Sequence, residues 1–243
     1  MVGEHAFRVE GAEPVNHGDM NLAALPGGDQ DILGAFDKGL LECLRSAERV
    51  VLVANNPAIG QADVDALALG SRDAVVSFNT CLKWPLLNSL SANIFIHGYN
   101  APDQYFFGLP YKPEVQALWQ APKARCFTIL VGVAHAMSPV RGVSLFRERI
   151  PLPALWNYPV AHTNGKRFVG PSTGFNALVL FDWLRHDQGM EYRLLTLGYS
   201  NDGGKLWSGH AWAYERTWLA NANVETIALQ RQPSWWQRLL KRR

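Results

Sequence analysis

The sequence predicts a three-layer α/β fold in which helices cover both faces of a mostly parallel sheet. Its apolar runs are continuous rather than alternating, as expected for strands that are buried on both faces. The runs that predict strands lie at residues 50–54, 74–78, 93–97 and 127–131. A length of 243 residues and an apolar content of 48% suffice for a single domain of this class with a sizeable core.

The chain is expected to comprise a leader, a domain and a tail. Residues 1–30 contain several glycines and acids and lack the basic start and apolar run of a secretory signal, so a flexible leader is expected. The domain spans residues 31–230, and a basic amphipathic tail covers residues 231–243. A core-facing helix follows Asp31, its candidate N-cap. Its apolar stripe comprises Ile32, Leu33, Phe36, Leu40, Leu41 and Leu44.

A β-turn-α-β unit is predicted in the second half of the chain. A strand end and turn occupy residues 168–174, a helix covers residues 175–185, and a strand follows at residues 193–197. Ser172 and Thr173 stand at the helix start, where backbone N–H groups and the helix dipole favour an anion such as phosphate. The alternative is that one of these hydroxyls simply caps the helix.

Charge and cysteine content exclude several classes of protein. The net charge is +2, and the basic excess lies in the tail after residue 230, so nucleic-acid binding is not expected. Cys43, Cys81 and Cys126 lack metal-ligand spacing and lie among apolar residues, which is typical of reduced buried thiols. The sequence contains no apolar run long enough to span a membrane. We therefore expect a soluble, cytoplasmic enzyme or binding protein.

Asparagine side chains follow the first two predicted strands. Asn55 and Asn56 come directly after the first strand, and Asn79 ends the second. Open α/β sheets bind ligands at the carboxyl ends of their strands. An amide can read a base, a ribose or a phosphate because it offers both a donor and an acceptor, although an Asn-Asn-Pro sequence can also be only a turn.

Four short elements occur in one order along the chain. They are the Asn turn, a Phe-Asn strand end, Pro-Ser-Thr-Gly before a helix, and His210 followed by Glu215 in a His-x-x-x-x-Glu pattern. This order resembles the sialyltransferases that carry sialyl motifs. Residues 50–82 resemble the large motif, 170–198 the small motif and 210–215 the very small motif. The chain would be a minimal, bacterial-type relative, similar over about residues 50–219.

The resemblance implies an inverting glycosyltransferase with a variant Rossmann-like sheet and no metal or other cofactor. The donor would be a CMP-activated acidic sugar of the sialic acid or Kdo type, and the acceptor a surface glycan or a lipid-linked precursor. His210 would act as the general base, because imidazole exchanges protons readily near neutral pH. Glu215 would orient the histidine or play a structural role. The donor-binding candidates are Asn55, Asn56, Asn79, Ser172, Thr173 and Gly174.

The sequence also departs from the family pattern. Arg49 and two valines stand where the large motif begins with a cysteine, so the family's linking disulfide is missing. No third motif precedes His210, and Lys205 is a candidate for neutralising the donor phosphate in its place. We also expect the chain to lack the membrane stalk of the secretory-pathway members. Two rivals remain: a transferase with another nucleotide-sugar donor, and a non-catalytic nucleotide- or glycan-binding accessory protein.

Two further features bear on metals and membranes. Asp63-Val64-Asp65 matches the Asp-x-Asp of metal-dependent transferases, but we interpret it as a surface or helix-start sequence, and the remaining histidines show no ligand spacing. The tail places Trp235, Trp236, Leu239 and Leu240 on one helical side among basic residues. This composition suits an interfacial helix on anionic lipid at the inner membrane face, or a terminal helix packed on the domain.

Overall fold

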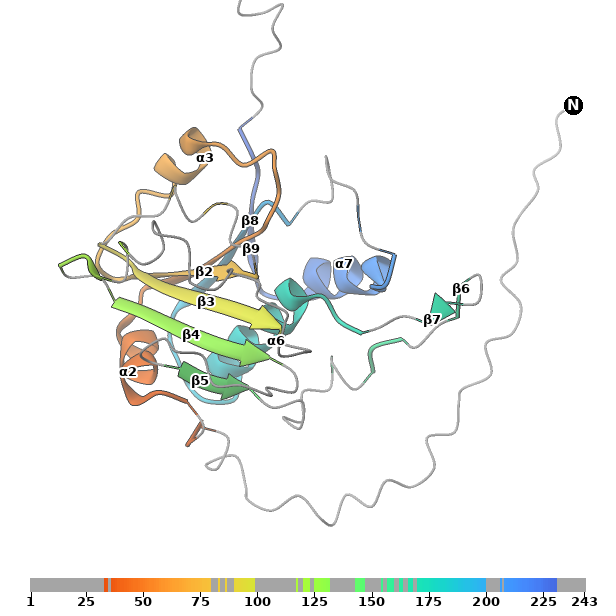
Figure 1. Ribbon diagram of the computed structural model, residues 1–243, viewed down its shortest axis with the longest axis horizontal. Helices are drawn as coiled ribbons and strands as arrows, with labels where there is room; N and C mark the ends of the chain where they lie inside the picture. The colour runs from red at the N-terminus through yellow and green to blue at the C-terminus, as the bar shows by residue number, and fades with distance from the viewer. Residues whose placement is uncertain are drawn as a thin grey trace, which may run out of the picture.

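The computed structural model describes residues 33–34, 36–79, 83, 86, 90–98, 117, 120–122, 125–131, 143–146, 154, 157–159, 162–163, 166–167, 170–199, 206 and 208–230. One seven-stranded sheet has the order β5-β4-β3-β2-β1-β8-β9, and every neighbouring pair is parallel (Figure 1). Its strands are β1 (Arg49–Val53), β2 (Asp73–Phe78), β3 (Ala92–Gly98), β4 (Arg125–Val131), β5 (Val143–Phe146), β8 (Arg193–Leu197) and β9 (Glu225–Ile227). The predicted α/β class and parallel sheet are confirmed.

Helices cover both faces of this sheet. The described helices are α2 (Lys38–Ser46), α3 (Gln61–Asp65), α6 (Thr173–His186) and α7 (Trp212–Asn221). Helices α2 and α6 pack on one face and α3 on the other (Figure 1). Along β1, Val50 and Leu52 belong to the first core and Val51 and Val53 to the second. This explains the continuous apolarity of the strand, because neither of its faces meets water.

Helix α2 begins later than predicted. Its N-cap is Asp37, whose side chain accepts a hydrogen bond from the N–H of Leu40 at 3.0 Å. Asp31, the predicted N-cap, lies outside the described residues. The buried stripe of the helix includes Leu40 and Leu44, as the periodicity indicates.

In the unit around α6, the predicted strand end at residues 168–169 lies outside the described residues. Before α6, β6 (His162–Thr163) and β7 (Lys166–Arg167) form a separate antiparallel pair, so β7 is not a strand of the large sheet. Helix α6 starts at Thr173, and Ser172 caps it by accepting from the N–H of Phe175. Strand β8 has the predicted bounds. The prediction omitted α7, β5 and β9.

The order of strands creates a switch point beside β1. From β1 the chain adds β2 to β5 successively on one side, and then returns to place β8 on the other side of β1. Such a reversal leaves a crevice at the carboxyl ends of the central strands, which is the usual ligand site of open α/β sheets. The end of β1 carries Asn55 and Asn56 directly into this crevice region.

The described residues include two of the three cysteines but neither the leader nor the tail. Cys43 is buried and Cys126 half-buried, both as free thiols, and burial raises the pKa of Cys126 to about 12. Cys81, the leader 1–30 and the tail 231–243 lie outside the described residues. Within the described ranges, no helix has the length and apolarity needed to cross a bilayer.

Candidate active site

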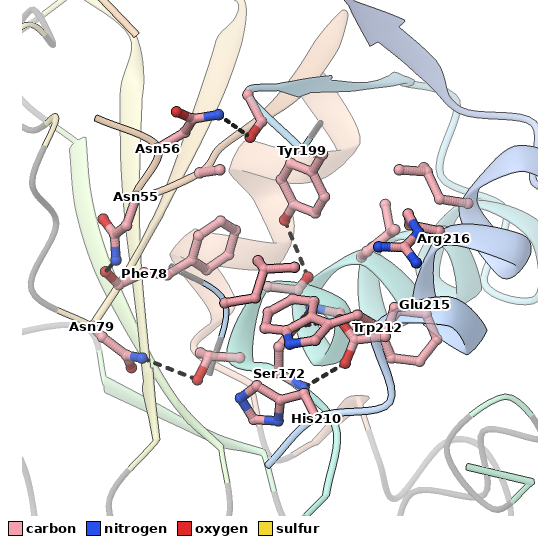
Figure 2. Close-up of a pocket in the computed structure, with 18 of the residues that line it drawn as sticks. Asn55, Asn56, Phe78, Asn79, Ser172, Tyr199, His210, Trp212, Glu215 and Arg216 are labelled. Atoms are coloured by element: carbon pink, nitrogen blue, oxygen red, sulfur yellow. Dashed lines mark hydrogen bonds between the residues drawn. The ribbon is translucent and has the colours of Figure 1, made fainter. Parts of the chain in front are cut away.

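A pocket of about 370 Å³ lies at the carboxyl edge of the sheet, between the ends of β1, β2 and β8 and the helices α6 and α7 (Figure 2). The predicted site residues that line it are Asn55, Asn56, Asn79, Ser172, Thr173, Gly174, His210 and Glu215. They come from segments that are far apart in the sequence. Lys205, the other predicted site residue, lies outside the described residues.

The Asn turn connects the ends of three strands. The side chain of Asn56 donates to the carbonyl oxygen of Gly198 at 3.1 Å and accepts from the N–H of Ala58 at 2.9 Å. Asn55 donates to the carbonyl oxygen of Phe78 at 2.8 Å. Asn56 is buried and its amide oxygen and nitrogen both bond to the protein, so its main contribution is to hold the turn against β8.

Two residues with positive φ shape the edge of the pocket. Asn79 has φ +47°, and its side chain donates to the hydroxyl oxygen of Thr173 at 3.2 Å, which joins the end of β2 to the start of α6. Gly198 has φ +75°, and a Cβ there would lie 2.5 Å from Cδ1 of Ile59. Only glycine fits this position, because both the backbone angle and the close approach exclude a side chain.

A carboxylate of the protein already occupies the start of α6. Glu215 accepts hydrogen bonds from the N–H of Ser172 at 2.9 Å and from its hydroxyl group at 2.7 Å (Figure 2). The single hydroxyl hydrogen of Ser172 therefore points to Glu215 and cannot be donated to a phosphate. The N–H groups of Thr173 and Gly174 have no acceptor within the described residues, so they are the donors that this helix start could offer to an anion.

Tyr158 completes the environment of Glu215. Its hydroxyl donates to Glu215 at 2.8 Å and accepts from the N–H of Ala211 at 2.6 Å. Burial and the bond to Glu215 raise the pKa of Tyr158, so it remains a neutral donor. Within the described residues Glu215 bonds to Tyr158 and Ser172 and not to His210. It thus joins the His-x-x-x-x-Glu segment to the start of α6.

His210 is oriented by the backbone of the Pro-Ser-Thr-Gly segment. Its Nδ1 lies 2.6 Å from the carbonyl oxygen of Gly170, and its ring makes an edge contact with Trp212. Because a carbonyl oxygen can only accept, Nδ1 carries the hydrogen in this contact. In the neutral ring Nε2 then holds the lone pair, which is the state that a general base requires.

Arg216 is a pocket residue that the sequence analysis missed. Trp212, Glu215, Arg216 and Leu219 follow the i, i+3, i+4, i+7 spacing of one helix face, and all four line the pocket. The signal that could have identified Arg216 is this spacing, counted from the Glu of the His-x-x-x-x-Glu pattern. Tyr158 carried no comparable signal, since no recognised motif surrounds it.

The Asp-x-Asp sequence forms the second half of the short helix α3, where Asp63 caps the helix start and Asp65 lies on the surface. Asp63 is buried and accepts from the N–H groups of Gly60 at 2.7 Å and Gln230 at 2.6 Å. Asp65 is exposed and accepts from the side chain of Gln61 at 2.7 Å. Neither carboxylate lines the pocket. Among the described residues, no group of three or more potential ligands could hold a metal ion.

Comparisons with protein-family models, with curated proteins and with solved structures each gave no match.

Proposed function

We propose that the chain is an inverting glycosyltransferase that moves an acidic sugar from a CMP-activated donor to a hydroxyl group of a glycan or glycolipid. The main support for this proposal is that distant sequence elements meet at one pocket. Four short elements that the resemblance groups by order, from Asn55 to Glu215, lie around one pocket at the carboxyl edge of a parallel sheet. The Rossmann-like glycosyltransferase variant of the α/β fold is part of the same proposal.

The pocket offers suitable contacts for a nucleotide. Its volume lies in the range of small-molecule sites, and it combines aromatic walls with a few polar groups. Phe78 and Tyr199 provide apolar surface for a base or a ribose, and Asn79 provides an amide. The N–H groups of Thr173 and Gly174 at the start of α6 would bind an oxygen of the phosphate.

In the proposed reaction, His210 Nε2 accepts the proton of the acceptor hydroxyl group. The hydroxyl oxygen forms a bond to the anomeric carbon on the face opposite the leaving group. The bond between that carbon and the phosphate oxygen breaks, and CMP departs with the electron pair. Charge develops on the leaving phosphate, so donors fixed near it stabilise the transition state. The products are the inverted glycoside, CMP and a protonated histidine, which then returns its proton to water.

Thermal unfolding in the presence of CMP, CDP, UMP, UDP and GDP tests the nucleotide class. Binding to the native state alone adds about 2.7 kcal/mol at a hundredfold excess of ligand over Kd. We expect CMP to give the largest increase in Tm and EDTA to leave it unchanged. A larger increase with UDP and Mn²⁺, and none with CMP, would replace the CMP donor by another nucleotide sugar.

Release of CMP from a CMP-sugar in the presence of an acceptor distinguishes an enzyme from a binding protein. The transferase should release CMP at a rate that depends on the acceptor and on His210. A protein that binds CMP tightly but releases none from CMP-sialic acid or CMP-Kdo with any glycan acceptor would be the non-catalytic accessory protein.

A further inference from the structure

Arg216 is a cation in the wall of the pocket, and it has no role in the proposed reaction. It lies on α7, across the pocket from Asn55 and Asn79 (Figure 2). The neighbouring residues of its helix face, Trp212 and Leu219, are apolar. Within the described lining, Arg216 is the side chain with a permanent positive charge.

Several other arginines of the described part pair their guanidinium within the protein, whereas the exposed Arg45 does not. Those that donate hydrogen bonds to protein oxygens are Arg49 to Asp73, Arg125 to Ser71, Arg185 to Asp182 and Arg193 to Glu225. Arg216 has no hydrogen bond or ion pair with any described residue. Its guanidinium can therefore pair with a ligand without first breaking a contact in the described part of the protein.

The acid beside Arg216 does not neutralise it. Glu215 is the only acidic residue among the described lining residues, and its two oxygens accept from Ser172 and Tyr158. The pocket thus has its negative charge at the start of α6 and its positive charge on Arg216 of α7, a lining residue that is exposed to solvent. A ligand with an anionic group gains most by placing that group against Arg216.

We propose that Arg216 binds the anionic group of the activated sugar, its phosphate or its carboxylate, and so supplies the positive charge that the missing third motif would provide. This inference rests on the proposed function, because it requires that the pocket bind a nucleotide or its sugar conjugate. A guanidinium presents a planar pair of N–H groups that matches phosphate and carboxylate oxygens. Such a contact weakens as salt concentration rises.

Dissociation constants for cytidine, CMP and CMP-sialic acid, measured by calorimetry, test this role. The variants are Arg216→Gln, which removes the charge, and Arg216→Lys, which keeps the charge but not the planar fork. Arg45→Gln is the matched control, because Arg45 is exposed on α2, away from the pocket, and makes no described contact. The Tm of each variant shows that it is folded.

A phosphate contact predicts that Arg216→Gln weakens CMP binding by roughly 10- to 100-fold and leaves the affinity for cytidine unchanged. The affinity of Arg216→Lys for CMP should lie between those of the wild type and of Arg216→Gln. A carboxylate contact predicts the same loss for CMP-sialic acid only. Equal affinities of Arg216→Gln and Arg45→Gln for all three ligands would overturn the inference while leaving the proposed function intact. If the wild type prefers uridine and UMP, the dissociation constants of these two ligands are compared instead. A weaker binding of UMP but not of uridine in Arg216→Gln then supports the inference and rejects only the CMP donor. No binding of either nucleoside series overturns both.

Discussion

The two ends of the sheet use polar residues in opposite ways. At the amino end, Arg49 on β1 faces Asp73 on β2 and Arg193 on β8, and Arg193 pairs with Glu225 on β9. These four side chains form a row of charges, and each of them makes an ion pair with a side chain of a neighbouring strand. At the carboxyl end, by contrast, polar side chains converge on a cavity, with positive charge available to a ligand. The first end serves stability, and we assign binding and chemistry to the second.

The pair of Arg49 and Asp73 is the strongest contact of the amino end. Its two hydrogen bonds measure 2.7 and 2.6 Å, and Asp73 is only 4% exposed. Burial opposes ionisation of Asp73, but the bonds from Arg49 and from the N–H of Gly70 outweigh it, so the pKa of Asp73 is lowered. The pair of Arg193 and Glu225 is exposed to water and is held less firmly.

The largest expected effect belongs to the pocket. We predict that His210→Ala lowers kcat by roughly 10² to 10⁴ without lowering the Tm, because general acid–base catalysis contributes about that factor. Initial rates of CMP release from the donor give this value. His186→Ala is the control, since His186 is exposed on α6 and does not line the pocket. Turnover close to that of the wild type in His210→Ala would place the base elsewhere.

The next effect belongs to the amino end. Asp73→Asn should lower the free energy of unfolding by about 2–3 kcal/mol, because it leaves the partly buried charge of Arg49 without its partner. Urea denaturation measures this loss. The affinity for CMP should not change, since Asp73 lies at the opposite end of β2 from the pocket. A changed affinity with unchanged stability would invert our assignment of the two ends.

The same pair predicts a pH dependence with a definite sign. A carboxyl whose pKa is lower in the folded than in the unfolded chain stabilises the fold above its unfolded value of about 3.9. This contribution disappears as the pH falls through the folded value. The difference in stability between wild type and Asp73→Asn should therefore stay constant from pH 7 to about 5 and shrink below about 4. A difference that grows on acidification would contradict the lowered pKa of Asp73.

A smaller effect is expected at the start of α6. Thr173→Val should weaken CMP binding by roughly 5- to 10-fold, since the methyl group that replaces the hydroxyl group removes the acceptor for Asn79 and a polar contact for phosphate. Isothermal titration with CMP provides the measurement. Unchanged affinity would leave Thr173 only its place in the first turn of the helix.

The smallest effect is expected at the exposed pair on β8 and β9. Glu225→Gln should change the free energy of unfolding by less than about 1 kcal/mol, because water and salt screen an exposed ion pair. The difference should vanish in urea denaturation at high salt. A loss as large as that of Asp73→Asn would mean that the row of charges acts as one cooperative unit.

The central strands could be predicted, because burial on both faces leaves a continuous apolar run in the sequence. Strand β9 could not, since it is short and its residues are exposed or half-buried. Helix α7 was missed because its pocket face mixes aromatic, acidic, basic and aliphatic residues, which removes the apolar periodicity. The motifs identified most of the pocket's polar residues, whereas the pairing of Tyr158 with Glu215 depends on tertiary contacts that no local pattern encodes.

The long return of the chain to β1 has a consequence for folding. Residue 49 pairs with residue 73 on one side and with residue 193 on the other, so the second pairing must close a much longer loop. Contacts of such sequence separation form late, because the entropy of closure is lost before the contacts compensate for it. The pocket needs Asn55 and Asn79, which follow β1 and β2, and also Gly198 and His210, which follow β8. A nascent chain therefore has no complete pocket until β8 has docked, and a molecule that binds this pocket would stabilise only the finished fold.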